Sequence, residues 1–244
     1  MIKRFNRFEL KYIVTASLRD ALLPEIRERM ASDPESTEGG VYRVTSLYYD
    51  TPDLAFFRAK LDGIKFRRKL RVRIYGEQAQ APETPAMVEI KQRINRTVQK
   101  RRIALSLSEA YALCAGARGE DLADERDAEV AGEVEFLVRS LNLSPTCVIS
   151  YVRHAFMGSA YEPGLRVTFD AGLRCGGPEG GLNPTDLFHF LPPDRCVMEV
   201  KANEAIPLWI VRLLARHSVS VQRYSKYCAG LAVLRAQRSR REHG

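Results

Sequence analysis

The chain has 244 residues, of which 45% are hydrophobic and 28% are charged, and its formal net charge is +8. This composition excludes a disordered chain, and the length suits one large domain or two small ones with a substantial core. The positive charge predicts an anionic partner without naming it. No apolar run approaches the roughly 20 residues of a membrane-spanning helix, and no signal peptide precedes the first predicted strand. We therefore expect a soluble, cytoplasmic protein.

The N-terminal part of the chain alternates between strand and helix patterns. Residues 5–14 predict a strand, because apolar and charged side chains alternate along it. Residues 15–30 predict a helix, in which Pro24 is expected to cause a kink or an early end. A strand at residues 41–50 then leads through a turn into a short helical piece at residues 54–58.

The most informative strand is predicted at residues 66–75. One face carries a row of four positively charged side chains, Arg67, Lys69, Arg71 and Arg73. The other face is apolar apart from Arg68. Side chains on one face of a strand are about 7 Å apart along it, so such a row repels itself unless a polyanion lies beside it. This strand therefore predicts a polyanion-binding surface.

The rest of the chain continues the mixture of strands and helices. Strands are predicted at residues 87–93, 97–105, 147–156, 165–170 and 196–201. Helices are predicted at residues 106–115, 129–141, 207–217 and 225–237. Without βαβ alternation, this pattern is typical of an α+β fold with an antiparallel sheet. We expect one domain over residues 1–238, followed by a basic tail at residues 239–244.

Charged faces recur on most of the predicted strands. The residues that share a face are Lys11 with Glu9, Lys91 with Arg93, Lys100 with Arg102, Arg153 with Tyr151, Arg166 with Asp170, and Lys201 with Glu199. One such face is usually a solvated surface, but their recurrence favours a shared polar interior, as in an antiparallel β-barrel. A lumen lined by Arg and Lys suits a chain of phosphates, because guanidinium groups donate two hydrogen bonds to phosphate oxygens.

Two strand carboxylates bear on metal binding. Glu89 and Glu199 each lie two residues from a lysine. A carboxylate that faces phosphate costs energy unless a cation such as Mg²⁺ or Mn²⁺ lies between them. Each glutamate could instead pair with an arginine of a neighbouring strand.

Other catalytic and metal-binding motifs are absent from the sequence. There is no GxGxxG after a strand, no Walker A run and no HExxH. The four histidines lack ligand-like spacing. The five cysteines show no CxxC pattern, which is typical of reduced, buried thiols in a cytosolic protein.

The sequence resembles the VTC-domain family, the polyphosphate-polymerase branch of the triphosphate tunnel metalloenzymes (CYTH-like superfamily). The resemblance extends from Phe5 to about Leu234. In the first half of the chain it is carried by Phe8-Glu9-Leu10-Lys11-Tyr12, Leu47-Tyr48-Tyr49-Asp50-Thr51, Lys69-Leu70-Arg71-Val72-Arg73-Ile74-Tyr75 and Glu89-Ile90-Lys91. In the second half it is carried by Ser150-Tyr151-Val152-Arg153-His154-Ala155-Phe156, Leu165-Arg166-Val167-Thr168-Phe169-Asp170, Glu199-Val200-Lys201 and Tyr224-Ser225-Lys226-Tyr227.

The resemblance implies an eight-stranded antiparallel β-barrel with flanking helices, in which ATP donates its γ-phosphoryl group to inorganic polyphosphate with the help of Mn²⁺ or Mg²⁺. It implies catalytic roles for Arg71, Arg73, Lys91, Arg153 and Arg166. It implies phosphate binding by Lys11, Lys100, Tyr151, Lys201, Arg223, Ser225 and Lys226. It places the metal on Glu199, ahead of Glu89 and Glu9.

Three positions depart from the family pattern. The superfamily's N-terminal ExExK signature is here Arg7-Phe8-Glu9-Leu10-Lys11, with the first carboxylate replaced by Arg7. This favours the polymerase branch over a triphosphatase or a cyclase. Arg93 stands where the eukaryotic polymerases carry a histidine, and Arg223 where they carry a lysine. Arg223 keeps the charge but changes its geometry.

Two other functions remain open from the residues alone. A metal-dependent hydrolase of tripolyphosphate or nucleoside triphosphates would use the same face with water as the acceptor. A non-catalytic module could bind polyphosphate or RNA. RNA binding usually interleaves aromatic residues with basic ones, and the basic faces predicted here are nearly free of aromatics, so we expect no nucleic-acid partner. Protein partners are not indicated by the sequence.

Overall fold

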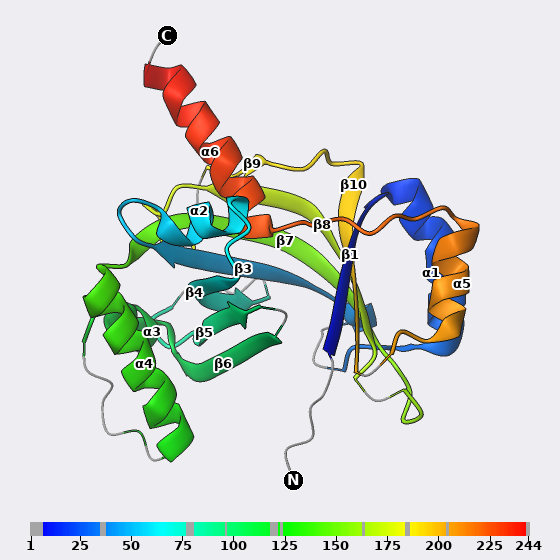
Figure 1. Cartoon of the computed structure of the whole chain (residues 1–244), viewed down its shortest axis with the longest axis horizontal. Helices are drawn as coiled ribbons and strands as arrows, with labels where there is room; N and C mark the ends of the chain where they lie inside the picture. Colours follow the sequence, from blue (N-terminus) through cyan, green and yellow to red (C-terminus); the bar gives the residue numbers. More distant parts are fainter. Residues whose placement is uncertain are drawn as a thin grey trace. The chain divides into compact units, whose positions relative to one another are not determined.

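A computed structural model describes residues 7–34, 38–76, 81–95, 97–117, 122, 124–162, 164–183, 186–203 and 205–242. The chain divides into two compact units. Unit 1 comprises Met1–Arg43, Tyr151–Leu173 and His189–Ser225, and unit 2 comprises Val44–Ser150, Arg174–Phe188 and Lys226–Gly244. Each unit is described by itself below, with the labels of Figure 1.

Unit 1 is built on antiparallel strands in the order β1-β10-β8-β7. These strands are β1 (Arg7–Thr15), β10 (Arg195–Asn203), the first part of β8 (Arg166–Gly176) and the second part of β7 (Ser144–Met157). The short strand β2 (Ala31–Ser32) pairs with β7. Along β1 and β10, Tyr12, Met198 and Val200 are buried in the apolar core, whereas the alternate positions carry the charged residues. The predicted alternation therefore separates a core face from a charged face.

Two helices cover the core of unit 1. α1 (Ala16–Arg29) begins at its cap Thr15, and α5 (Leu208–Arg216) lies beside it (Figure 1). The guanidinium of Arg29 lies 5.5 Å from the ring centroid of Trp209, and Arg216 forms an ion pair with Glu25. The helix α1 continues through Pro24, so the predicted early end was wrong. Pro24 is on the exposed side of the helix, where water can satisfy the carbonyl that loses its partner.

Unit 2 is built on antiparallel strands in the order β7-β3-β4-β5-β6. They are the first part of β7, most of β3 (Val41–Asp50), β4 (Phe66–Tyr75), β5 (Pro85–Ile94) and β6 (Thr97–Ser106). The core face of these strands is formed by buried apolar residues that include Leu47, Leu70, Val72, Val88, Ile90 and Ile103. Each predicted strand of this unit is confirmed, within a few residues at either end.

Four helices belong to unit 2. They are α2 (Ala55–Leu61), α3 (Leu107–Cys114), α4 (Glu125–Leu141) and α6 (Lys226–Glu242). Helix α3 begins with a capping box between Ser106 and Glu109. Helix α4 begins four residues earlier than predicted, because the Asp124 carboxylate accepts hydrogen bonds from the amides of Arg126 and Asp127.

Two short elements complete the described chain, η1 (Glu38–Gly40) and β9 (Phe188–His189), which pairs with β8. The predicted α+β class, with an antiparallel sheet of eight main strands and flanking helices, is confirmed. The single-domain boundary at residue 238 stays a prediction, although α6 continues to Glu242. In the parts of the chain that are described, no helix is both long and apolar enough to cross a membrane. All five cysteines are buried and free, as the sequence predicted.

Candidate phosphate-binding site

The cross-strand register of unit 2 gathers polar residues on the face opposite its core. Arg71 pairs with Tyr48 on β3 and with Glu89 on β5, and Arg73 pairs with Ser46. Further along, Lys100 of β6 is opposite Lys91. Directly paired residues on neighbouring strands point to the same side of a sheet. We call this set the β4–β6 face; its members are Ser46, Tyr48, Lys69, Arg71, Arg73, Glu89, Lys91 and Lys100.

Glu89 is the carboxylate around which three cations of the β4–β6 face gather. Its Oε2 accepts from Nε of Arg71 at 2.6 Å and lies 3.6 Å from a terminal nitrogen of Arg73, and Lys100 forms an ion pair with Oε1. The Glu89 side chain is only 1% exposed. Burial alone would raise the pKa of Glu89, but Arg71, Arg73 and Lys100 outweigh it and hold that pKa well below its usual range. Glu89 therefore stays ionised, and these contacts set one negative charge against three positive ones.

Two hydroxyl groups of β3 hold the arginines of the β4–β6 face. A terminal nitrogen of Arg71 donates to the Tyr48 hydroxyl at 2.8 Å, and Nε of Arg73 donates to Oγ of Ser46 at 3.0 Å. Sequence reasoning did not single out Ser46 or Tyr48 as site residues. The signal was present, because both share the parity of one face of the predicted strand at 41–50.

The first turn of α6 lies next to the β4–β6 face. The Tyr227 ring stacks on the Tyr48 ring, with centroids 4.9 Å apart and an interplanar angle of 25°. The ammonium group of Lys69 lies 5.5 Å from the centroid of Tyr227. Lys226, the first residue of α6, is buried. The first turn of α6 therefore contacts the β4–β6 face through Tyr227, while phosphate binding by Ser225 and Lys226 stays a prediction.

In unit 1 the register of β1, β10 and β8 builds a second polar face, the β1–β10 face. Lys11 pairs with Glu199, and Glu9 pairs with Lys201. The Lys11 ammonium lies 3.2 Å from Glu9 and 3.4 Å from Glu199, while Lys201 lies 3.3 Å from the other oxygen of Glu199. Glu199 is thus a nearly buried carboxylate between two lysines.

Two arginines of unit 1 are each held by a carboxylate. Arg153 donates from Nε and a terminal nitrogen to the two oxygens of Asp170, at 2.7 and 2.8 Å, and both residues are buried. Burial would lower the pKa of Arg153, but Asp170 outweighs it and keeps the guanidinium charged. Arg153 also donates to the Tyr151 hydroxyl at 3.3 Å. The predicted pairing of Tyr151 with Arg153 is therefore present.

Arg166 is oriented by a segment in which the sequence indicated no site residue. Its terminal nitrogen donates to Asp33 at 2.5 Å and to the Tyr42 hydroxyl at 3.0 Å. Asp33 follows β2 in the stretch between the predicted helix at residues 15–30 and the predicted strand at residues 41–50, where no periodicity distinguishes one side chain from another. Its partnership with a residue 133 positions away could not be inferred from the sequence.

The donors around Glu199 suit a hard divalent cation. Mg²⁺ and Mn²⁺ are typically held by one or two carboxylates together with phosphate oxygens. Glu199 and Glu9 lie on either side of Lys11, and Thr168, directly opposite Glu199, has a buried hydroxyl oxygen without a hydrogen-bond partner. Within the described ranges, no group of three or more His, Cys, Asp or Glu could hold a metal. These residues therefore fit a cation that phosphate helps to hold, and they do not form a complete protein cage.

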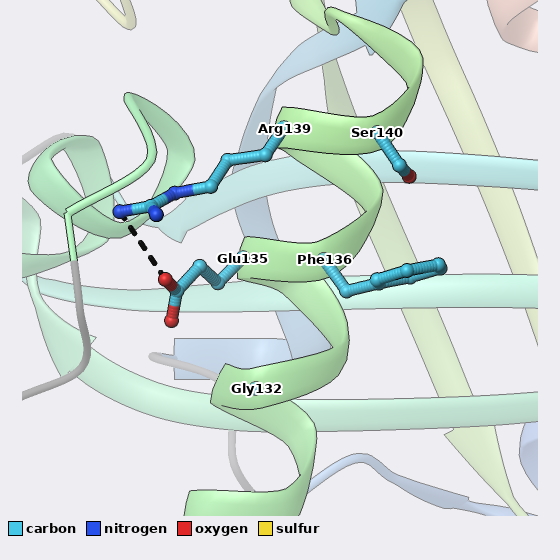
Figure 2. A pocket seen from close by; sticks show the side chains of 5 residues that line it. All are labelled: Gly132, Glu135, Phe136, Arg139 and Ser140. Carbon is cyan, nitrogen blue, oxygen red and sulfur yellow. Dashed lines mark ion pairs between the residues drawn. The ribbon is translucent and has the colours of Figure 1, made fainter.

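The remaining predicted residues are placed as follows. Arg223 is exposed and Ser225 is half-buried, both in the segment between α5 and α6. A surface hollow of about 460 Å³ lies elsewhere, on the outer side of α4. Figure 2 shows its lining, which includes the ion pair of Glu135 and Arg139 and the exposed ring of Phe136. None of the residues that line it was predicted to bind phosphate.

The fold of this chain is similar to that of a solved structure of another protein. A solved structure of a candidate adenylyl cyclase from Hippeastrum, described as having a dominant triphosphatase activity, has a TM-score of 0.51 and 11% identity, and the match covers 92% of this chain and 94% of that one. A candidate adenylate cyclase from Bacillus halodurans has a TM-score of 0.49 and 14% identity, with 89% and 92% covered. At these identities the likeness to the Hippeastrum structure concerns the fold alone.

The family follows from the sequence itself. The VTC domain family matches residues 6–235, and the chain belongs to this family. Subunit 4 of the vacuolar transporter chaperone complex of Trypanosoma brucei brucei is 25% identical over an alignment of 227 positions that covers 78% of this chain. The chain spans only 28% of the length of that relative.

Proposed function

We propose that this chain is a polyphosphate polymerase that transfers the γ-phosphoryl group of ATP onto a growing inorganic polyphosphate chain and depends on Mn²⁺ or Mg²⁺. The observation that carries the proposal is the β4–β6 face, where Arg71, Arg73 and Lys100 converge on the single carboxylate of Glu89. The excess positive charge of this cluster favours a ligand with closely spaced negative charges. Membership of the VTC domain family supports the same ligand class.

In unit 2, the basic residues bind the phosphates of the polymer. Arg71 and Arg73 are the catalytic arginines of this face, because guanidinium groups stabilise the charge that spreads over phosphoryl oxygens during transfer. Glu89, Tyr48 and Ser46 fix their orientation before the ligand arrives. Lys91, Lys100 and Lys226 add positive charge for neighbouring phosphates.

In unit 1, the arginines and lysines bind the phosphates of the nucleotide. Arg153 and Arg166 are the catalytic arginines here, oriented by Asp170 and Asp33. Glu199 would hold the divalent cation, which supplies positive charge to the nucleotide phosphates when bound. The further phosphate-binding residues of this unit are Lys11, Tyr151, Lys201, Arg223 and Ser225.

The proposed phosphoryl transfer requires no covalent protein intermediate. In-line phosphoryl transfer is catalysed mainly by positioning and by charge stabilisation, so the terminal phosphate of the acceptor can attack the γ-phosphorus directly. The buried thiols are unsuited to act as nucleophiles, since burial raises the pKa of Cys114, Cys175 and Cys196 to about 12.

The test is to incubate the purified chain with ATP and Mn²⁺ and to separate the products on a polyacrylamide gel. A ladder of polyphosphate is expected. Free phosphate without a ladder would identify a hydrolase that uses water as the acceptor, and unchanged ATP would identify a binding module. Either result would reject the polymerase.

Site variants give the first testable prediction. Arg73→Ala and Glu199→Gln are each expected to lower polymer synthesis by at least about 100-fold, since each removes a charge that stabilises the transferred group or its metal. Arg68→Ala is the matched control, because Arg68 lies on the same strand as Arg73 but on the opposite face. Wild-type synthesis by Arg73→Ala or Glu199→Gln, with the fold confirmed by circular dichroism, would reject the site.

A further inference from the structure

Tyr48 lies among the cations of the β4–β6 face. Its hydroxyl receives a hydrogen bond from Arg71 at 2.8 Å, and the guanidinium of Arg71 lies 5.7 Å from the centre of its ring. Burial would raise the pKa of Tyr48, but the charges of Arg71, Arg73 and Lys69 outweigh it and lower the pKa to about 8. The Tyr48 hydroxyl thus lies within the influence of three cations of the β4–β6 face.

Asp50 fixes the position of Tyr227, whose ring stacks on the ring of Tyr48. It is fully buried and accepts hydrogen bonds from the amides of Phe56 and Phe57 at 2.9 Å and from the Tyr227 hydroxyl. The neutral Tyr227 is favoured, because burial and the Asp50 charge raise its pKa. Asp50 therefore ties the end of β3 to α2 and to the first turn of α6 through fixed hydrogen bonds.

The stacked rings connect this buried carboxylate to the basic row. Tyr227 donates to Asp50 with its hydroxyl, and its ring packs on the ring of Tyr48. The rings of Phe57 and Tyr227 also form an edge-to-face pair, with centroids 6.4 Å apart and an interplanar angle of 88°. A ring held in this way has little rotational freedom, so the hydroxyl of Tyr48 is presented in one position.

We propose that Tyr48 is a further phosphate-contacting side chain of the β4–β6 face, and that Asp50 acts through Tyr227 to position it. The inference rests on the proposed function only for the choice of phosphate as the ligand. A neutral phenol beside Arg71 can donate its proton to a phosphate oxygen that Arg71 also binds, which adds a directional hydrogen bond to the charge attraction. The same contact would be made by free tripolyphosphate and by the end of a longer chain.

The contact has a pH signature. The charged groups that face Tyr48 are Lys69, Arg71 and Arg73 on β4, and Tyr227 faces it from α6, with Asp50 beyond. A bound phosphate adds negative charge, which raises the pKa of Tyr48 and favours its protonated form. Near pH 8 the fraction of Tyr48 that is ionised before binding must therefore take up a proton when phosphate binds. Above that pH, affinity for phosphate falls because the phenolate repels it.

The experiment is calorimetric titration of the full chain with tripolyphosphate at pH 8, in EDTA, in two buffers that differ in their enthalpy of ionisation. Wild type and Tyr48→Phe are compared, so that protons exchanged by tripolyphosphate itself cancel. Tyr48→Phe is expected to bind about 10-fold more weakly, the loss of one hydrogen bond to a charged group, and to take up fewer protons. Tyr227→Phe is expected to bind several-fold more weakly while its ring still stacks.

The matched control is Tyr49→Phe. It removes the same hydroxyl from the next residue of β3, which lies in the apolar core of unit 2. Its affinity and proton uptake are expected to match wild type. Equal affinity and equal proton uptake in Tyr48→Phe and wild type would overturn the contact, and an unchanged affinity in Tyr227→Phe would overturn the positioning role. If wild type synthesises polymer and Tyr48→Phe matches it in affinity and proton uptake, only this inference is refuted. If wild type binds no tripolyphosphate, the proposed function is refuted too.

Discussion

At the residue scale, carboxylates determine how the predicted phosphate ligands are presented. Arg71 is held by Glu89, Arg153 by Asp170 and Arg166 by Asp33. A long cationic side chain without such a partner loses more conformational entropy when it binds its ligand. The internal carboxylates therefore preorganise the cations, at the expense of some of the positive charge that attracts the ligand.

Glu89 allows a test of this cost in positive charge, because its carboxylate can be neutralised without changing the size of the side chain. Glu89→Gln leaves Arg71, Arg73 and Lys100 without their shared counter-charge. We expect the free energy of unfolding of the variant to be about 1–3 kcal/mol lower than that of wild type. The partial exposure of Arg71 and Lys100 keeps this loss small, because water screens their charges. Because the variant also lacks the negative charge that opposes a polyanion, tripolyphosphate should raise its melting temperature more than that of wild type. An equal rise in both proteins would contradict this role for Glu89.

The pH dependence of stability follows from the depressed pKa of Glu89. A carboxylate whose folded pKa lies below its unfolded value of 4.5 contributes stability that is present above that value and is lost as the pH falls towards the folded pKa. The free energy of unfolding of wild type should therefore decrease as the pH is lowered below about 4.5. Urea unfolding at pH 3 and pH 6 measures the difference, which should be smaller in Glu89→Gln.

At the scale of elements, side-chain caps begin the helices α1, α3 and α4. The helix α2 begins differently, because its cap residue Leu54 makes no side-chain hydrogen bond. Its first amides are satisfied by residues that precede the turn, since Thr51 accepts from Ala55 and Asp50 accepts from Phe56 and Phe57. The sequence predicted a turn into a short helix here, but only the structure shows that the same Asp50 also binds Tyr227.

Two consecutive residues on opposite sides of helix α4 are expected to differ in their contribution to stability. Leu137 is 2% exposed in the core of unit 2, whereas Phe136 is 67% exposed beside the hollow of Figure 2. Leu137→Ala should lower the free energy of unfolding by about 2–5 kcal/mol through the cavity it creates. Phe136→Ala should change it by no more than about 0.5 kcal/mol. Chemical denaturation of both variants is the measurement, and similar losses in the two would show that the orientation of α4 is wrong.

At the scale of the whole molecule, periodicity explains which features the sequence revealed. Alternation along β1, β4, β5, β6 and β10 was enough to predict the strands, the two sides of each strand and the charged residues on them. Alternation along a strand could not reveal ion-pair partners that lie in loops or on other strands. Asp33 and Asp170, for example, reach their arginines only through tertiary packing. The extra length of β8 was also missed, because its second part passes through a stretch with several glycines. The roles of the predicted site residues stay predictions.

The two polar faces differ in their balance of charge, and this difference predicts a divided metal requirement. In the β4–β6 face, three cations contact one carboxylate. In the β1–β10 face, two lysines, Lys11 and Lys201, contact two carboxylates, those of Glu9 and Glu199. The first face can bind a polyanion by direct charge attraction, while the carboxylates of the second repel phosphate until a divalent cation is bound.

We therefore expect the chain to bind tripolyphosphate in EDTA and to bind ATP more tightly when Mn²⁺ is present. Glu199→Gln should abolish the Mn²⁺-dependent gain for ATP and leave tripolyphosphate binding in EDTA within about twofold, because Glu199 contacts Lys11 and Lys201 of the β1–β10 face. Arg71→Ala should weaken tripolyphosphate binding in EDTA by at least about 10-fold, the loss of a charge-assisted contact. Titration calorimetry with and without the metal separates these effects. A Glu199→Gln variant that loses tripolyphosphate binding in EDTA, or an Arg71→Ala variant that keeps it, would show that the metal requirement is not divided in this way.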